Sequence, residues 1–252
     1  MATTERSIWN GWLVLSIGLV LSTGIAAQSW VKVRLHQDRT IDVTGSAKRR
    51  IVSDLIQWQA SIETENKDRT AGYHALAGHV QQTLAYLKKQ GITDSEVRVA
   101  AADTEQVFET EYVGKSEDRI EKKTFKGYKI SQAISVDSKD VAKIERVSRE
   151  VTQLMDSGVP ITSQAPSYYY TGLGALKIEM LAEAARDARV RADRMLQSTG
   201  GASLGRLRRA DMGVININPA NATAVSSEGN NDTTSLDKDI LTIVHCRFEL
   251  DR

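Results

Sequence analysis

The chain has 252 residues, of which 41% are hydrophobic and 26% charged, a composition typical of a globular protein and unlike that of a disordered or collagen-like chain. Its 33 Lys and Arg residues against 32 Asp and Glu residues give a net charge of +1, so no overall field attracts a polyanion and nucleic acid is not expected as a partner. Cys246 is the only cysteine, which excludes an intramolecular disulfide and a cysteine-based zinc cluster.

The N-terminal part of the chain contains an uncharged segment, residues 7–31. A helix of that length reaches about 37 Å, which is enough to cross a hydrocarbon layer of about 30 Å. Trp9, Trp12 and Trp30 lie near its two ends, where tryptophan rings favour the headgroup region. We therefore expect residues 1–39 to form a single-pass membrane anchor and a linker.

A cleaved signal peptide is the alternative for the same segment. Its apolar run, residues 11–27, is short and ends in small residues, as signal peptides do. The positive charge expected before such a run is weak, because Arg6 is offset by Glu5. A retained anchor is therefore favoured over export after cleavage.

Charge alone leaves the orientation of this anchor open. Lys32, Arg34 and Arg39 lie directly after the segment, and the positive-inside rule would place the C-terminal domain in the cytoplasm. Long folded domains translocate largely regardless of their charge, so the rule does not decide the question.

The first half of the main domain predicts hairpins and helices. Residues 41–65 alternate apolar and polar side chains and predict two strands joined by a turn at residues 45–50. Residues 68–91 have a helical apolar period that ends at Gly91. Two strands are expected near residues 96–112 and 124–136, joined by a charged hairpin loop at 114–122.

The second half continues in the same style and predicts an α+β fold. Ser138 is expected to cap a helix over 138–158. The next elements are a strand at 161–170, a long helix at 173–198, strands at 207–217 and 241–250, and a polar mobile loop at 218–239. The order β-β-α-β-β-α-β-α-β-β favours one α+β domain over residues 40–252 rather than a doubly wound sheet.

The long helix contains four arginines within residues 182–196. At about 100° per residue its apolar side chains fall on one arc, which we expect to be buried; these are Ile178, Leu181, Ala184, Ala185, Ala188, Ala192, Met195 and Leu196. On the opposite face Asp187 precedes Arg191 by four residues, and Arg189 precedes Asp193 by four, which pairs opposite charges. This indicates a solvated face rather than a phosphate-binding one, and an alanine seam that lies close to a sheet.

Candidate metal-binding and acid–base residues are scattered. His74 and His79 are five apart and so rotated by about 140° on their helix, which does not suit a shared metal ion. Glu63, Glu65 and Asp68 form an acidic cluster without EF-hand spacing. No metal or cofactor is expected.

The sequence also does not indicate a nucleophilic catalytic site or a phosphate loop. His245 and Cys246 are adjacent in a strand, so their side chains point to opposite faces. Gly172 and Gly174 precede the long helix but lack the remaining residues of a phosphate loop, which indicates a flexible helix entrance. No residue is assigned a catalytic role.

Two surface features remain as candidate contacts. The basic groups at residues 48–50 and 206–209 are expected to be solvated turn and strand ends, with anionic lipid or an acidic partner as the alternative. Tyr168, Tyr169 and Tyr170 lie in one strand, so at least one ring should be exposed and could form a subunit interface.

Four stretches together resemble the SIMPL domain family. The sequence AEAARDARVRADRMLQSTGGASLGRLRRADMG (182–213) is similar to the family's Ala-rich helix followed by a glycine pair and a strand. Residues 41–63, with Val-Thr-Gly at 43–45, resemble its opening hairpin, and 91–109 and 127–144 resemble later steps. The likeness runs from about Ile41 to Leu250. It is incomplete after Val-Thr-Gly, where members often have a further glycine and this chain has Ser-Ala-Lys-Arg-Arg at residues 46–50.

The resemblance implies a bacterial envelope protein at the inner membrane that faces the periplasm. Some relatives have stress-related roles and form homo-oligomeric rings, and the molecular activity of the family is unassigned. We accordingly expect a non-enzymatic, membrane-anchored protein that self-associates and serves as a scaffold or stress-related factor. The alternatives are a ligand-binding or signalling module that uses the tyrosines and the 218–239 loop, with its ligand unknown, and an enzyme whose site lies between subunits.

Overall fold

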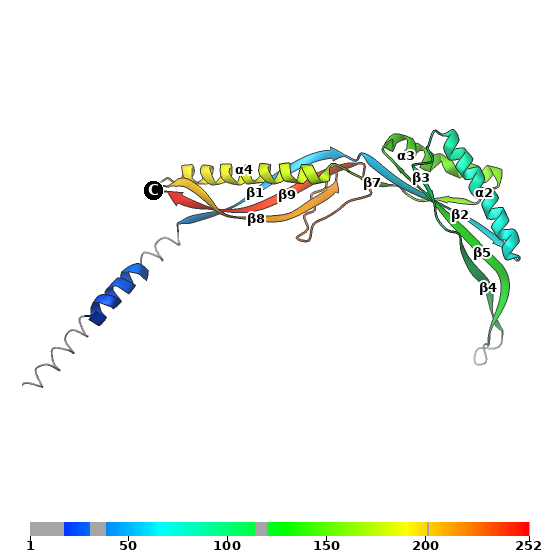
Figure 1. Cartoon of the computed structure of the whole chain (residues 1–252), viewed down its shortest axis with the longest axis horizontal. Helices are drawn as coiled ribbons and strands as arrows, with labels where there is room; N and C mark the ends of the chain where they lie inside the picture. The colour runs from blue at the N-terminus through cyan, green and yellow to red at the C-terminus, as the bar shows by residue number, and fades with distance from the viewer. Residues whose placement is uncertain (1–17, 31–38, 114–119, 201, 252) are drawn as a thin grey trace, which may run out of the picture. The chain divides into compact units, whose positions relative to one another are not determined.

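The computed structural model of the chain describes residues 18–30, 39–113, 120–200 and 202–251 and confirms the α+β class (Figure 1). In chain order the elements are β1 (Thr40–Val52), β2 (Leu55–Asn66), α2 (Arg69–Lys89), β3 (Val97–Val99), β4 (Asp103–Val113), β5 (Ile120–Ser138), α3 (Val141–Glu150), the 3₁₀ helix η1 (Val151–Ser157), β6 (Ile161–Ser163), β7 (Ser167–Tyr169), α4 (Leu173–Thr199), β8 (Ser203–Pro219) and β9 (Asp237–Asp251).

The expected membrane anchor is only partly within the described residues. Residues 18–30 form a helix, and Trp30 at its end is exposed. Trp9 and Trp12 lie outside the described residues, as does the rest of the 7–31 segment. Of the helices that the structure describes, none combines the length and apolar character needed to cross a membrane. The anchor therefore stays a prediction.

The chain folds into two compact units. We call the first the terminal unit; it contains the described residues up to Ala47, Glu179–Val214, and the residues from Thr242 onward. The second, the central unit, contains Lys48–Ile178 and Ile215–Leu241. A three-stranded sheet has the order β1-β9-β8, and a six-stranded sheet has the order β3-β5-β2-β6, with β4 on β5 and β7 on β2.

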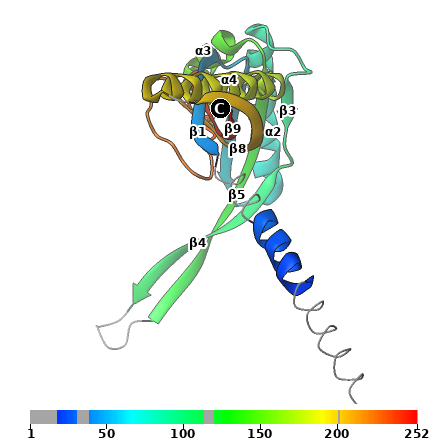
Figure 2. The ribbon, with the colours of Figure 1, turned by 90° about the vertical axis from the view of Figure 1, so that its left-hand side faces the viewer.

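In the terminal unit α4 covers one face of its sheet (Figure 2). The buried helix residues Met180, Ala184, Ala188 and Ala192 recur at intervals of four. Such spacing gives a narrow ridge, so side chains on its flanks stay in solvent. The prediction that Ile178 and Met195 are buried is therefore wrong, because they are 72% and 49% exposed.

Gly45 allows α4 to approach β1. A Cβ atom there would lie 2.1 Å from the carbonyl oxygen of Ala184 and 2.5 Å from the backbone nitrogen of Ala188. The backbone N–H of Ser46 also donates a 2.8 Å hydrogen bond to Asp187 on the helix. The turn predicted at residues 45–50 is wrong, because β1 continues to Val52; its glycine makes room for the helix instead.

The central unit has its core on the face of the sheet that α2 and α3 cover. The largest fully buried side chains there come from the sheet and both helices: Ile56, Trp58, Ile62, Leu76, Leu87, Ile130, Ile134 and Ile144. Trp58 is satisfied by a 2.9 Å hydrogen bond from its Nε1 to Ser163 Oγ. Helix α2 is confirmed, with Asp68 as its N-cap and Gly91 in the left-handed region at φ 77°.

Several boundaries in this unit differ from the prediction for local reasons. Asp140, not Ser138, caps α3, because Ser138 is the last residue of β5. The helix predicted to run to residue 158 changes to 3₁₀ geometry at Val151. The strand predicted over 161–170 is two short strands, since Pro166 between them has no N–H for a ladder.

The polar segment between β8 and β9 is held at several points. The backbone carbonyl of Thr233 accepts a 2.7 Å hydrogen bond from Tyr168, and that of Leu236 accepts one of 2.9 Å from Ser53. Buried Lys238 lies 3.1 Å from the carboxylate of Asp232. The mobility expected of residues 218–239 stays a prediction, and these contacts limit it to the residues between them.

Candidate functional site

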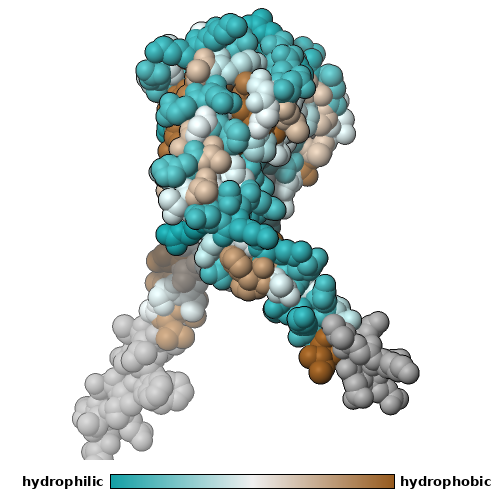
Figure 3. All heavy atoms as spheres, turned by 90° about the vertical axis from the view of Figure 1, so that its right-hand side faces the viewer, coloured by the Kyte–Doolittle hydropathy of each residue, from teal (hydrophilic) through white to brown (hydrophobic). Residues whose placement is uncertain are grey.

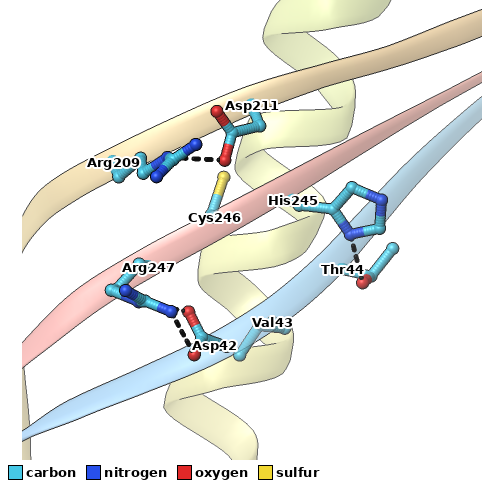
Figure 4. A pocket seen from close by; sticks show the side chains of 8 residues that line it. All are labelled: Asp42, Val43, Thr44, Arg209, Asp211, His245, Cys246 and Arg247. Atoms are coloured by element: carbon cyan, nitrogen blue, oxygen red, sulfur yellow. Dashed lines mark hydrogen bonds and ion pairs between the residues drawn. The ribbon is translucent and has the colours of Figure 1, made fainter.

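The open face of the terminal unit's sheet, opposite α4, carries a cavity of about 310 Å³ (Figure 4). Its lining comes from all three strands: Asp42, Val43, Thr44, Arg209, Asp211, His245, Cys246 and Arg247. Successive side chains of a strand point to opposite faces of the sheet. In β1 the buried residues Val43 and Gly45 therefore face the helix, whereas the exposed residues Asp42 and Thr44 face the cavity.

The charged side chains of this cavity bind each other. Arg247 donates two hydrogen bonds to Asp42, of 2.7 and 3.0 Å, which lower the pKa of the carboxyl and raise the pKa of the guanidinium. Arg209 lies 2.7 Å from Asp211. A ligand that used any of these groups would have to compete with an existing ion pair.

One hydroxyl–imidazole contact in the cavity has the distance of a nucleophile–base pair. Thr44 Oγ1 lies 2.9 Å from His245 Nδ1. Within the described residues no carboxylate bonds to the other ring nitrogen, the third group that orients a catalytic base. Sequence reasoning did not single out Thr44, because its partner is 201 residues away. The neighbouring Cys246 points to the other face as predicted, is 2% exposed, and has its pKa raised by burial.

The candidate metal and acid–base residues of the central unit have separate local partners. Asp68 caps α2 through the backbone N–H groups of Thr70 and Ala71. Glu63 lies 2.7 Å from Lys129. His74 is exposed beside Tyr73. The structure therefore does not bring the predicted acidic and histidine residues to one place.

Both basic groups form ion pairs with acidic residues. Lys48 and Arg50 lie within β1, 3.0 and 2.8 Å from the carboxylate of buried Asp239. Hydrogen bonding from Arg50 holds the pKa of Asp239 well below its usual range. Arg206 and Arg208 both bind Glu249 at 2.8 Å. The side chains of Lys48 and Arg50 are half exposed, as the expectation of a solvated group requires, but the expected turn is wrong, because both residues lie within β1, where they neutralise buried Asp239.

The tyrosine stretch is distributed between core and surface. Tyr168 is 8% exposed and its pKa is raised by burial. Tyr169 is half-buried and pairs with Leu55 between β7 and β2. Tyr170 is half-buried with its ring against Gly172. A subunit interface at Tyr168–Tyr170 stays a prediction, one that Tyr169 and Tyr170 are better placed than Tyr168 to fulfil.

The central unit also has a two-stranded projection, which we call the arm (Figure 2). It comprises residues 107–113 of β4 and 120–127 of β5, beyond the point where β2 stops pairing with β5 at Asn66 and Tyr128. Its large apolar side chains are 44% to 71% exposed: Phe108, Tyr112, Ile120 and Phe125. Figure 3 shows apolar side chains near the outer end of the arm on an otherwise mostly hydrophilic face.

Three aromatic rings in contact with one another extend from the sheet onto one face of the arm. Phe108 lies opposite Phe125 with ring centroids 5.7 Å apart, and Phe125 is 5.2 Å from Tyr128. The arm leaves the sheet at a β-bulge next to Val107, where a Cβ on Gly127 would lie 2.7 Å from the carbonyl oxygen of Asn66. A bulge and a close-contact glycine are the usual means of redirecting a ribbon.

The family relationship fits this architecture. The model of the family described as "SIMPL: Protein of unknown function (DUF541)" matches residues 41–239. The chain belongs to the SIMPL family. No curated protein matches it.

The SIMPL resemblance of the sequence is now explained by packing. Val43-Thr44-Gly45 is the place where β1 meets α4, and the Ala-rich helix supplies the small side chains at Ala184 and Ala188. These residues specify the fold of the terminal unit. They therefore carry the family likeness without identifying a reaction.

Proposed function

We propose that this SIMPL protein is a non-enzymatic envelope protein that self-associates through its arm. In this proposal the N-terminal segment anchors it in the bacterial inner membrane with the main domain in the periplasm, where it serves as a scaffold or stress-related factor. The observation that carries the proposal is the exposed apolar surface of the arm at Phe108, Tyr112, Ile120 and Phe125.

The arm has the properties of a contact element. A two-stranded ribbon without a third strand or a covering helix is only marginally stable in water. Exposed apolar groups that gather on one element, rather than occurring singly, indicate a protein-binding surface. The aromatic contacts of Phe125 with Phe108 and Tyr128 already order this surface before any partner arrives. Burying it in an assembly would remove apolar area from water and stabilise the ribbon.

The cavity on the terminal unit supports a non-enzymatic role. Its arginines bind its aspartates, and Thr44 and His245 lack an orienting third group among the described residues. A hydrolase that works through a nucleophilic side chain would need that side chain to be activated by an oriented base. An interaction protein needs no such arrangement.

The test is the mass of the full-length protein in detergent, by size-exclusion chromatography with light scattering, with intact-mass spectrometry to see whether residues 1–39 are retained. We expect the wild type to form a discrete oligomer, and the double variant Phe108→Ser and Phe125→Ser to dissociate. The matched control is Met155→Ser with Val225→Ser, two exposed apolar side chains outside the arm, which should leave the mass unchanged. A wild type that stays monomeric throughout the micromolar range, and forms no crosslinks in membranes, would refute self-association.

A further inference from the structure

The two strands of the arm carry opposite charge. Every charged residue of β4 is acidic: Asp103, Glu105, Glu109 and Glu111. Those of β5 between residues 120 and 129 are basic apart from Glu121: Lys122, Lys123, Lys126 and Lys129. The arm is therefore an acidic strand beside a basic strand.

Both long edges of the arm have unpaired backbone groups. Within the described residues β4 pairs only with β5. Residues 120–127 of β5 pair only with β4, because the ladder between β5 and β2 ends at Tyr128. Free edges of this kind add a further strand readily.

Opposite charges attract each other within the arm. Lys126 Nζ lies 2.6 Å from the Glu109 carboxylate, a hydrogen bond that raises the pKa of the lysine. Glu111 lies directly opposite Lys122 in the ladder. Cross-strand pairs of opposite charge favour strand pairing, and like charges placed opposite each other disfavour it.

We infer that copies of this chain join by pairing the β4 edge of one arm with the β5 edge of the next. The new ladder is antiparallel and sets an acidic strand against a basic one, so the alternation inside one arm continues through the assembly. Pairing β4 with β4, or β5 with β5, would oppose like charges. The inference rests on the proposed self-association and specifies its partner and geometry.

The aromatic face agrees with this arrangement. Phe108 and Phe125 are cross-strand partners and so lie on the same face of the ribbon. Adding arms edge to edge keeps that face on one side of the growing sheet, where the rings of neighbouring copies meet. Because the two edges differ, the contact is head-to-tail and forms rings or open filaments rather than isolated twofold dimers.

A charge-exchange variant tests the inference while keeping the attraction inside the arm. It combines Glu109→Lys with Lys126→Glu, and Glu111→Lys with Lys122→Glu, in the full-length chain. We expect this variant to assemble with itself to the wild-type mass. In a dissociated and remixed sample with tagged wild type, we expect mixed assemblies to fall at least about tenfold below the statistical fraction, since every mixed edge opposes like charges.

The outcomes separate the competing arrangements. Statistical mixing would overturn edge pairing by charge, and preferential mixing would show β4–β4 or β5–β5 contacts instead. The matched control exchanges the ion pair of α3, Glu145→Arg with Arg149→Glu, and should mix freely. Should the exchange variant fail to fold by circular dichroism, the pair Glu109→Gln and Glu111→Gln replaces it; unchanged self-assembly of that variant would overturn the inference, and weakened assembly would support it. A monomeric wild type refutes the proposed function itself, whereas statistical mixing of assembled proteins refutes only the edge pairing.

Discussion

Gly45→Ala is the substitution whose effect is tied most directly to the structure. The added methyl carbon would lie 2.1 Å from the Ala184 carbonyl oxygen and 2.5 Å from the Ala188 nitrogen, where contacts under 3.0 Å essentially never occur. Both obstacles are backbone atoms, so no side-chain rotation relieves them. Helix α4 must therefore retreat from β1 by about 1 Å, which weakens dispersion contacts along its buried ridge.

The expected cost is at the upper end of the range for overpacking, about 3 kcal/mol. Retreat of the helix also lengthens the hydrogen bond from Ser46 to Asp187, which is now 2.8 Å. Urea unfolding of the full-length chain, followed by circular dichroism, measures the change as a lower midpoint. In thermal unfolding the same change corresponds to a melting temperature lower by about 6–12 °C for a chain of this size.

Gly78→Ala is the matched control, because nothing lies within 4 Å of its added Cβ on α2. That substitution should stabilise the protein by about 0.5–1 kcal/mol, since alanine has the higher helix propensity. If Gly45→Ala unfolds at the wild-type urea concentration while the control behaves as stated, close packing of α4 on β1 is not what Gly45 provides.

Three further predictions concern stability and access. Asp187→Ala removes the acceptor for the Ser46 N–H and should cost about 2 kcal/mol in urea unfolding, with Asp187→Asn closer to wild type; equal effects of the two would contradict this. Although burial raises the pKa of Asp232, hydrogen bonds led by those from Thr234 lower it to about 2, against 3.8 ordinarily. The ionised carboxyl therefore contributes about 2 kcal/mol above its unfolded pKa, a contribution lost as pH falls through about 2; urea titrations from pH 5 downward should show that loss in wild type and not in Asp232→Asn. Buried Cys246 should react with a thiol reagent only at the rate of unfolding, and rapid labelling of the native protein would refute its placement.

Local patterns were sufficient for most elements of the fold. The helical period found α2 and α4, and alternation placed His245 and Cys246 on opposite faces of β9. The charge pairing of Asp187 with Arg191 is also confirmed, at 2.9 Å. These features depend on residues within one or two turns of each other, which a single sequence displays.

Features that depend on distant partners were predicted less well. A glycine before a polar run fits both a turn and a close contact, and only the approach of Ala184, far along the chain, distinguishes the two at Gly45. The arc of apolar residues on α4 likewise gives the direction of the buried face but not its width. The contact of Thr44 with His245 likewise depends on the pairing of β1 with β9, which lie far apart in the sequence.

The arm shows why burial is the hardest of these properties to predict. Phe108 and Phe125 have the strand propensity and the hydrophobicity of core residues, yet both are nearly half exposed. The difference is set by the length of a neighbouring strand, because β2 ends its pairing with β5 at Asn66 and nothing among the described residues continues the sheet over the arm. Apolar surface that the monomer leaves in water costs free energy unless another molecule covers it. The charge difference between β4 and β5 is the basis for proposing a second arm as that molecule, because an acidic edge and a basic edge complement each other.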